Sequence, residues 1–227
     1  MVGGAIDIVM IEDEQQTIKS TSWHAQFALT NDLTQDSEVT IEINEQQIPI
    51  STYLDESGFV WYAENENSLI VTEQTDSDNV QSLMELEEDS EEKEELLETL
   101  NLFDKIRMPT KIQLHALRPF IVKGENKVVF KAKHKITQKV FVQTCSLFFW
   151  DKNSKIVISD IDGTITKSDV RGHIYEMMNS SNWIQPGLCS LYQSYEKKQY
   201  KLVYLSSRPL SRSGSTKSFL RKNSFPM

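Results

Sequence analysis

The sequence predicts an α+β chain in two parts: a β-sandwich that is split by an acidic linker, followed by an α/β part with parallel strands. Residues 1–65 hold short β-branched or aromatic runs separated by Asn, Asp and Gly, a composition typical of strands and turns. A dense acidic stretch follows within 66–108, and strand-like runs resume after it. With 227 residues, the chain is long enough for one large or two small domains.

The first part, 1–65, reads as strands joined by turns. The predicted strands are 5–11, 23–29, 38–43, 47–51 and 58–63. Asn44-Glu45 and residues 55–58 have the composition of hairpin turns. His24 lies on a predicted strand with no cysteine or second histidine nearby, so we interpret it as a packed or hydrogen-bonded residue rather than a metal ligand.

Residues 66–108 are predicted to form a linker. They include the acidic run 84–98, and such runs repel themselves and are usually solvated linkers or marginal helices. Leucines near 96–103 indicate a short amphipathic turn that docks at the end of the linker. Because a longer loop adds little closure entropy, strands on both sides of the linker can complete one sandwich.

The region 109–153 is predicted to complete the sandwich, and 154–227 to form the α/β part. Strands are expected at 111–117, 126–132, 139–150, 155–159 and 202–205, and helices at 172–178 and 186–198. Pro186 would occupy a favoured first helical position. Roughly 40 residues separate the last two strands, which is enough for one helical crossover between parallel neighbours.

Charge is divided unevenly along the chain. All but two of the 24 lysines and arginines follow residue 104, whereas most of the 33 aspartates and glutamates precede it. A basic half suits an anionic substrate or membrane surface. The alternative is that the two halves neutralise each other across a contact. Nucleic acid is not expected as a partner, because the lysines lack interleaved aromatic residues and no helix-turn-helix or finger pattern occurs.

The composition argues against a membrane-spanning, a secreted or a disulfide-rich protein. Mean hydropathy is −0.42, and no run approaches the roughly 18 apolar residues that a transmembrane helix needs. The first residues lack the basic and apolar regions of a secretory signal. Cys145 and Cys189 alone form neither a disulfide framework nor a metal cluster, so we expect a reducing compartment and a packing role for each thiol.

The segment 155–169 reads KIVISDIDGTITKSD and carries the chemistry. Strand periodicity places Asp160 and Asp162 on the same side, and two such close carboxylates need a cation or a shared proton. Mg²⁺ suits this site, with one carboxylate as nucleophile and the other as proton carrier. Gly163 permits a sharp turn whose following amides face phosphate oxygens. An acidic strand-to-loop turn without activity is the alternative.

This segment resembles the haloacid-dehalogenase-like phosphotransferases, and residues 158–169 resemble the catalytic segment of the lipins, the Mg²⁺-dependent phosphatidate phosphatases. Residues before and after this segment extend the resemblance: 5–9, 22–27, 41–44 and 58–61, then Trp183, Pro186-Gly187-Leu188, Leu191-Tyr192 and 200–208.

The resemblance implies an immunoglobulin-like sandwich followed by an incomplete haloacid-dehalogenase-like catalytic domain. It also implies hydrolysis of phosphatidate to diacylglycerol and phosphate through an aspartyl-phosphate. Asp160 would be the nucleophile, Asp162 the general acid and base, and both would bind Mg²⁺. Gly163, Thr164 and Ser206 would contact the substrate phosphate, with Thr164 also ordering the loop and Ser207 as the neighbouring alternative to Ser206.

The resemblance further implies a cytoplasmic protein, peripheral on the phosphatidate-containing endoplasmic reticulum or nuclear membrane, with the nucleus as a second location. The family pattern also has a lysine and further acidic metal ligands after later strands, and an amphipathic helix at the N-terminus. This chain stops at Met227, so we expect a lipin truncated at both ends that binds Mg²⁺ weakly. The alternatives are a non-catalytic phosphatidate-binding module and a phosphatase for soluble phosphate monoesters.

Overall fold

The computed structural model describes residues 3–30, 33–35, 37–63, 107–134, 137–167 and 183–227. The chain divides into two compact units, Met1–Phe149 and Trp150–Met227. Most of the predicted linker 66–108 and the predicted helix 172–178 lie outside the described residues.

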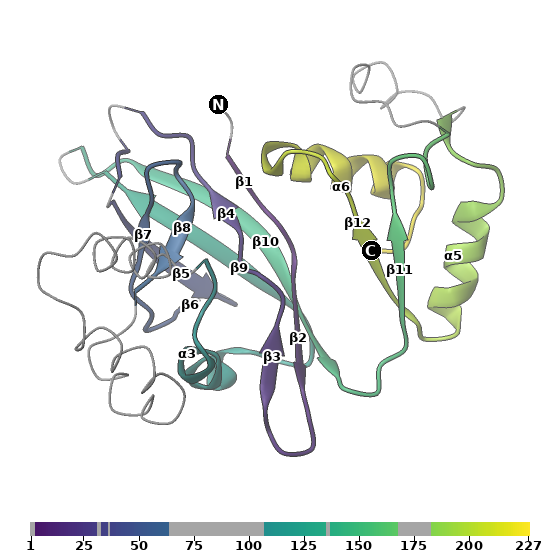
Figure 1. The fold of residues 1–227 in the computed structure, drawn as a ribbon, viewed down its shortest axis with the longest axis horizontal. Helices are drawn as coiled ribbons and strands as arrows, with labels where there is room; N and C mark the ends of the chain where they lie inside the picture. The colour runs from purple at the N-terminus through teal and green to yellow at the C-terminus, as the bar shows by residue number, and fades with distance from the viewer. Residues whose placement is uncertain (1–2, 31–32, 36, 64–106, 135–136, 168–182) are drawn as a thin grey trace, which may run out of the picture. The chain divides into compact units, whose positions relative to one another are not determined.

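Unit one is built on an eight-stranded sheet in the order β3-β2-β10-β9-β5-β7-β8, with β6 paired to β5 (Figure 1). The strands β1 and β4 form a separate antiparallel pair. The bounds are β1 Gly4–Ala5, β2 Ile8–Glu12, β3 Ile18–Ser20, β4 Ala25–Gln26, β5 Glu38–Ile43, β6 Gln46–Gln47, β7 Thr52–Leu54, β8 Val60–Tyr62, β9 Gly124–Lys133 and β10 Val140–Asp151.

The strands on the two sides of residues 64–106 belong to one curled sheet, as the sequence predicts for a shared structural unit. β5 pairs antiparallel with β9, with Ile41 opposite Phe130. Both side chains are fully buried, because alternate residues of each strand point into the same core. Hydrogen bonding runs continuously from β3 to β8, so the strands form a curled sheet where the sequence predicted a sandwich.

Two turns of unit one have the backbone that their composition predicts. Asn44 and Glu45 have φ values of 50° and 69° between β5 and β6, the left-handed conformation of tight hairpin turns. Gly58 has a φ of 77°, and a Cβ atom built there would lie 2.2 Å from the carbonyl oxygen of Phe27. Glycine is therefore required at residue 58 by both conformation and space.

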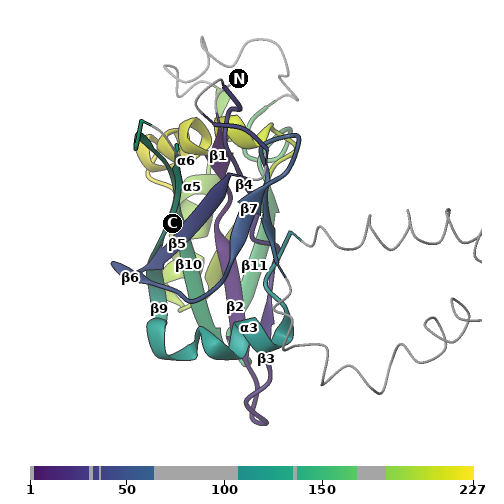
Figure 2. The same ribbon diagram turned by 90° about the vertical axis from the view of Figure 1, so that its left-hand side faces the viewer.

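The predicted strand 111–117 is wrong, because these residues form a helix, α3 Lys111–Ala116, followed by the short 3-10 helix η2 Arg118–Phe120. Thr110 accepts a hydrogen bond from the amide of Gln113, and the Gln113 side chain accepts one from the amide of Thr110. This capping box fixes the start of the helix. Figure 2 shows α3 across the end of the sheet beside β3, which it contacts.

Unit two contains a parallel pair of strands, β11 Ile156–Asp160 and β12 Lys201–Leu205, as predicted. The helix α5 Leu188–Lys197 lies between them in the chain, and η4 Leu210–Arg212 and α6 Ser213–Lys222 follow β12. Tyr192 of α5 and Phe219 and Leu220 of α6 share one buried core with Ile161 and Ile165.

The helix α5 begins later than predicted. Its N-cap is Gly187, which has a φ of 80°, and Pro186 lies before the helix instead of in its first turn. The left-handed backbone at Gly187 turns the chain after Pro186, so the helical hydrogen bonds start only beyond it.

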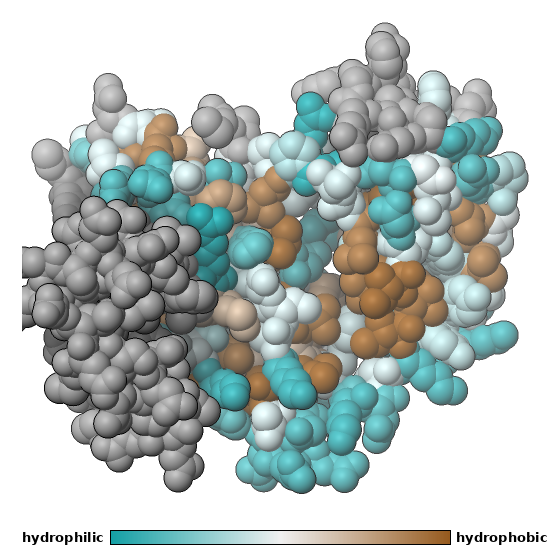
Figure 3. Space-filling view, viewed as in Figure 1, coloured by the Kyte–Doolittle hydropathy of each residue, from teal (hydrophilic) through white to brown (hydrophobic). Residues whose placement is uncertain are grey.

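The two faces of β11 differ in exposure. Ser159 faces inward and is buried, whereas Ile158 is 63% exposed and Ile156 is 42% exposed. Figure 3 shows apolar side chains gathered over β11 in unit two. Among the helices of the described residues, none has the length and apolar character that crossing a membrane requires.

Candidate functional site

The predicted site residues gather where the two parallel strands of unit two end. Asp160 is the last residue of β11 and pairs with Leu205, the last residue of β12. The amide of Ile161 donates to the carbonyl of Leu205 at 3.0 Å, so the pairing continues one residue further. Ser206 therefore follows directly after the residue opposite Asp160. The carboxyl ends of parallel strands are where ligands bind in open α/β sheets.

Asp160 is exposed at this edge and is held between two buried neighbours. Ile161 is 1% exposed in the core of unit two. Ser159 is also buried, and its hydroxyl lies 2.6 Å from the hydroxyl of Tyr192 in α5. These contacts fix the backbone on both sides of Asp160 and leave its carboxylate facing solvent, where it can reach a ligand.

The turn after Asp160 is closed by hydrogen bonds to Thr166. The amide of Gly163 donates to Thr166 Oγ1 at 3.2 Å, and Thr166 Oγ1 donates to the carbonyl of Ile161 at 3.1 Å. Gly163 has a φ of 91°, so the sharp turn predicted there is confirmed. The sequence predicts that Thr164 orders this loop, but its side chain is exposed, and Thr166, which is 2% exposed, has that role instead.

The amides that follow Gly163 are only partly available to a ligand. Those of Ile165 and Thr166 both donate to the carbonyl of Ile161 at 3.0 Å. Among these three amides, that of Thr164 has no hydrogen-bond partner in the described part of the chain, so it could face a phosphate oxygen.

The carboxylate of Asp162 is bound through both of its oxygens. Ser206 Oγ donates to Oδ2 at 2.9 Å, while Arg208 donates to Oδ1 from Nε at 3.0 Å and from a terminal guanidinium nitrogen at 2.7 Å. The side chains of Asp162 and Arg208 are 11% and 13% exposed. A partly buried carboxylate with three charge-assisted or hydroxyl donors is held firmly in one orientation.

Arg208 and Thr216 also belong to the site, although the sequence pattern did not indicate either of them. A second terminal nitrogen of Arg208 donates to Thr216 Oγ1 in α6 at 3.2 Å, and the backbone amide of Arg208 donates to Ser206 Oγ at 3.2 Å. Arg208 thus joins both strand ends to α6. Its position two residues after Ser206, in the loop that follows β12, is the signal that could have identified it.

The oxygen donors at this site fit Mg²⁺ in kind. The carboxylate of Asp160 and the main-chain carbonyl of Asp162 are hard oxygen ligands of the type that Mg²⁺ prefers. In the part of the chain that the structure describes, however, no three His, Cys, Asp or Glu side chains gather as a metal-binding group. The described residues therefore supply oxygen donors of the kind that Mg²⁺ prefers, without a complete set of acidic ligands.

The fold and this site define a mixed α+β protein with a polar site at the carboxyl ends of two parallel strands. Residues 105–224 match the family LNS2 (Lipin/Ned1/Smp2), and residues 1–85 match the lipin N-terminal conserved region. The first match covers more than half of the chain and includes every predicted site residue. The chain belongs to the lipin family.

Curated relatives extend this result. The chain is 45% identical over 78 residues to nuclear elongation and deformation protein 1 of Schizosaccharomyces pombe, covering 34% of this chain and 12% of that protein. It is 41% identical over 98 residues to phosphatidic acid phosphohydrolase 1 of Saccharomyces cerevisiae, covering 43% and 11%. It is 34% identical over 113 residues to human phosphatidate phosphatase LPIN1, covering 49% and 12%. The matches thus span only a small part of each relative.

Proposed function

We propose that this chain carries the nucleophile segment of a phosphatidate phosphatase, which releases diacylglycerol and inorganic phosphate. The observation that carries the proposal is the meeting of Asp160, Asp162 and Ser206 at the ends of two parallel strands, in a chain of the lipin family. Relatives of this family bear the name phosphatidate phosphatase, which supports the choice of substrate.

In the proposed reaction, a carboxylate oxygen of Asp160 attacks the phosphorus of a phosphate monoester. The bond from phosphorus to the lipid oxygen breaks, and Asp162 gives its proton to the departing alkoxide. Asp162 then takes a proton from water, whose oxygen attacks the aspartyl-phosphate and regenerates Asp160. Gly163, Thr164 and Ser206 would position the phosphate, since phosphoryl transfer depends mainly on positioning and charge stabilisation.

Mg²⁺, held by the Asp160 carboxylate and the Asp162 carbonyl, would supply positive charge that offsets the charge of the phosphate and of the two carboxylates. The chain's own residues keep Asp160 exposed at the strand end, with Ser159 and Ile161 buried on either side of it. Within residues 156–167, the described part of this segment, Asp160 and Asp162 are the two acidic side chains, so we propose weak Mg²⁺ binding.

The same proposal includes peripheral binding to phosphatidate-containing membranes at the endoplasmic reticulum or nuclear envelope, with the nucleus as a second location. It also assigns an immunoglobulin-like fold to unit one and a partial haloacid-dehalogenase-like fold to unit two. The assignment of unit two is supported by the parallel pair β11–β12 with the helix α5 between its strands in the chain, and that of unit one by the family resemblance of its strands.

A second candidate function is phosphatidate binding without hydrolysis. It is favoured by one observation: both oxygens of Asp162 are engaged by Arg208 and Ser206, so the proposed acid and base is not free to reach a leaving group in this conformation. Vesicle binding without phosphate release would identify this function.

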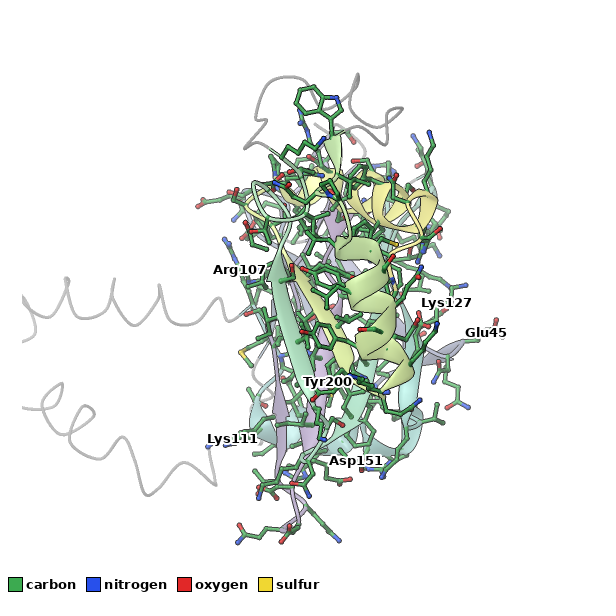
Figure 4. The ribbon with its side chains drawn as sticks, turned by 90° about the vertical axis from the view of Figure 1, so that its right-hand side faces the viewer. Glu45, Arg107, Lys111, Lys127, Asp151 and Tyr200 are labelled. Atoms are coloured by element: carbon green, nitrogen blue, oxygen red, sulfur yellow. The ribbon has the colours of Figure 1, made fainter. Side chains whose placement is uncertain are left out.

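The test is phosphate release from phosphatidate-containing vesicles, with and without Mg²⁺, by the chain and its Asp160→Asn variant. Asp151→Asn is the matched control, because it removes the same charge from an exposed aspartate at the end of β10. Figure 4 shows Asp151 and Tyr200 toward the same end, where β11 and β12 begin rather than where they end.

We expect Mg²⁺-dependent release by the chain and by Asp151→Asn, and none by Asp160→Asn. Release that survives in Asp160→Asn would exclude this residue as the nucleophile. No release by the chain, with binding to phosphatidate vesicles retained, would favour the non-catalytic function.

A further inference from the structure

The donors that Asp162 engages are those that a phosphate group would need. Arg208 presents Nε and a terminal nitrogen side by side, and this planar fork matches the oxygens of a carboxylate or of a phosphate equally well. Ser206 adds a hydroxyl donor to the same carboxylate. The predicted phosphate contact of Ser206 is therefore already made, in this conformation, to the protein's own Asp162.

The surroundings of Arg208 keep this donor set ready. Its guanidinium is anchored on the far side by Thr216 Oγ1 in α6, and Thr216 is itself only 9% exposed. The backbone amide of Arg208 also donates to Ser206 Oγ, so the two donor groups are tied to each other. Loss of the Asp162 side chain would leave an arginine and a hydroxyl that are still tied to each other and to Thr216, with their donors to Asp162 unpaired.

We propose that Ser206 and Arg208 form an anion subsite for a phosphate monoester, and that Asp162 occupies it as an internal substitute until the phosphate displaces it. This inference rests on the proposed function, because it names the substrate contacts of the same site. Displacement has two consequences. Arg208 neutralises the incoming phosphate, and Asp162 becomes free to transfer protons at the leaving oxygen.

Competition of this kind makes a specific prediction about affinity. A ligand binds more weakly when only a fraction of the protein has its site open, and removal of the internal competitor restores the full affinity. Asp162→Ala should therefore tighten the binding of inorganic phosphate by about tenfold or more. Arg208→Gln should weaken it by about tenfold, because the charged fork is lost.

Asp160→Ala is the matched control, since it removes an equal negative charge from the same strand end without touching Arg208. If phosphate binds more tightly only because a negative carboxylate no longer repels it, Asp160→Ala and Asp162→Ala should increase the affinity equally. Combining each alanine variant with Arg208→Gln completes a double-mutant cycle. When Arg208 is replaced, Asp162→Ala should no longer increase the affinity for phosphate more than Asp160→Ala does.

The experiment measures the dissociation constant of inorganic phosphate for each variant by titration calorimetry without Mg²⁺, with thermal melting as the check on folding. Arg208→Lys keeps the charge but loses the fork, and it replaces Arg208→Gln in the cycle if that variant does not fold. The same variants are then tested on phosphatidylcholine vesicles with and without phosphatidate, which separates a lipid phosphate from the free anion.

The cycle supports the inference if Asp162→Ala tightens phosphate binding more than Asp160→Ala does, and only while Arg208 is present. Equal effects of the two alanine variants would overturn it, as would the absence of phosphate binding in all variants. A chain that follows the cycle but hydrolyses no phosphatidate contradicts the proposed function alone. A chain that hydrolyses phosphatidate but fails the cycle contradicts this inference alone.

Discussion

The hydroxyl of Tyr192 lies 2.6 Å from Ser159 Oγ, joining α5 to β11 at the residue that precedes Asp160. Tyr192 is 5% exposed and packs against the rings of Tyr204 and Phe225, so its hydroxyl is directed into the core of unit two. This hydrogen bond attaches the crossover helix to the strand that carries the proposed nucleophile.

Tyr192→Phe is expected to lower the free energy of unfolding of unit two by about 1 to 2 kcal/mol, because Ser159 Oγ loses a buried partner. Ser159 still donates to the carbonyl of Asp160 at 2.9 Å, which limits the loss. Tyr195→Phe on the same helix is the control and should change stability little. Urea unfolding provides the measurement, and equal effects of the two variants would contradict the assigned role.

Arg107, at the end of the predicted linker 66–108, is joined to the turn between β7 and β8. Its guanidinium donates to the buried carboxylate of Asp55 at 2.8 Å and lies 4.3 Å from the centre of the Phe59 ring. Asp55, which is 3% exposed, also accepts the amides of Ser57 and Phe59. The Asp55 carboxylate thus accepts hydrogen bonds from two amides of the turn and from Arg107, and it holds the turn together.

Asp55→Ala should destabilise unit one by about 2 to 4 kcal/mol, since the turn amides lose their acceptor and Arg107 loses its partner. Arg107→Gln should cost about 1 kcal/mol, because the arginine is 42% exposed and the amides keep Asp55 satisfied. Denaturant unfolding of both variants shows which of them loses more unfolding free energy. A larger loss in Arg107→Gln than in Asp55→Ala would show that the ion pair, not the turn, dominates.

His24 makes the stability of unit one depend on pH. Burial, and secondly the positive charge of Arg107, lower the pKa of His24 from its usual value of 6.5. Below pH 6.5 the unfolded chain therefore binds more protons at this ring than the folded chain, so folding stability falls as pH decreases through this range. Above pH 6.5 the contribution is constant.

His24→Gln should remove this part of the pH dependence. Unfolding free energies of the chain and the variant, measured at several values between pH 5 and 8, should approach each other as pH falls and remain parallel above about pH 7. A difference between the two proteins that does not change with pH would contradict the assignment. The ring contact of His24 with Phe59, at 6.3 Å between centroids, agrees with the packed role predicted for this histidine.

Alternation of apolar residues predicts strands only where local hydrogen bonds do not compete. The bounds predicted for β5 match the structure because Val39, Ile41 and Ile43 alternate and all three enter the core. Residues 111–117 also alternate, yet they form α3, and Ile112 remains 50% exposed. The Thr110–Gln113 capping box outweighed the alternation, and it was visible in the sequence.

The sequence predicts which strand ends form the site, but not the hydrogen bonds between the side chains there. Strand spacing brings Asp160 and Ser206 to one edge, which the apolar runs before them indicate. The pairing of Asp162 with Arg208 depends instead on the direction of a long side chain after β12 and on its anchor, Thr216. Such contacts join segments far apart in the chain, so the position of Arg208 after Ser206 could mark it as a site residue but could not predict its pairing with Asp162.

Phosphorylation of Asp160 by phosphatidate is the step on which the proposed function depends most directly. The chain is mixed with phosphatidate-containing vesicles and Mg²⁺, quenched in acid, and mapped by peptide mass spectrometry after reductive trapping of acyl-phosphates. We expect modification at Asp160, none at this position in Asp160→Asn, and modification of Asp160 retained in the Asp151→Asn control. Phosphate release without any modification of Asp160, or modification at another carboxylate, would contradict it.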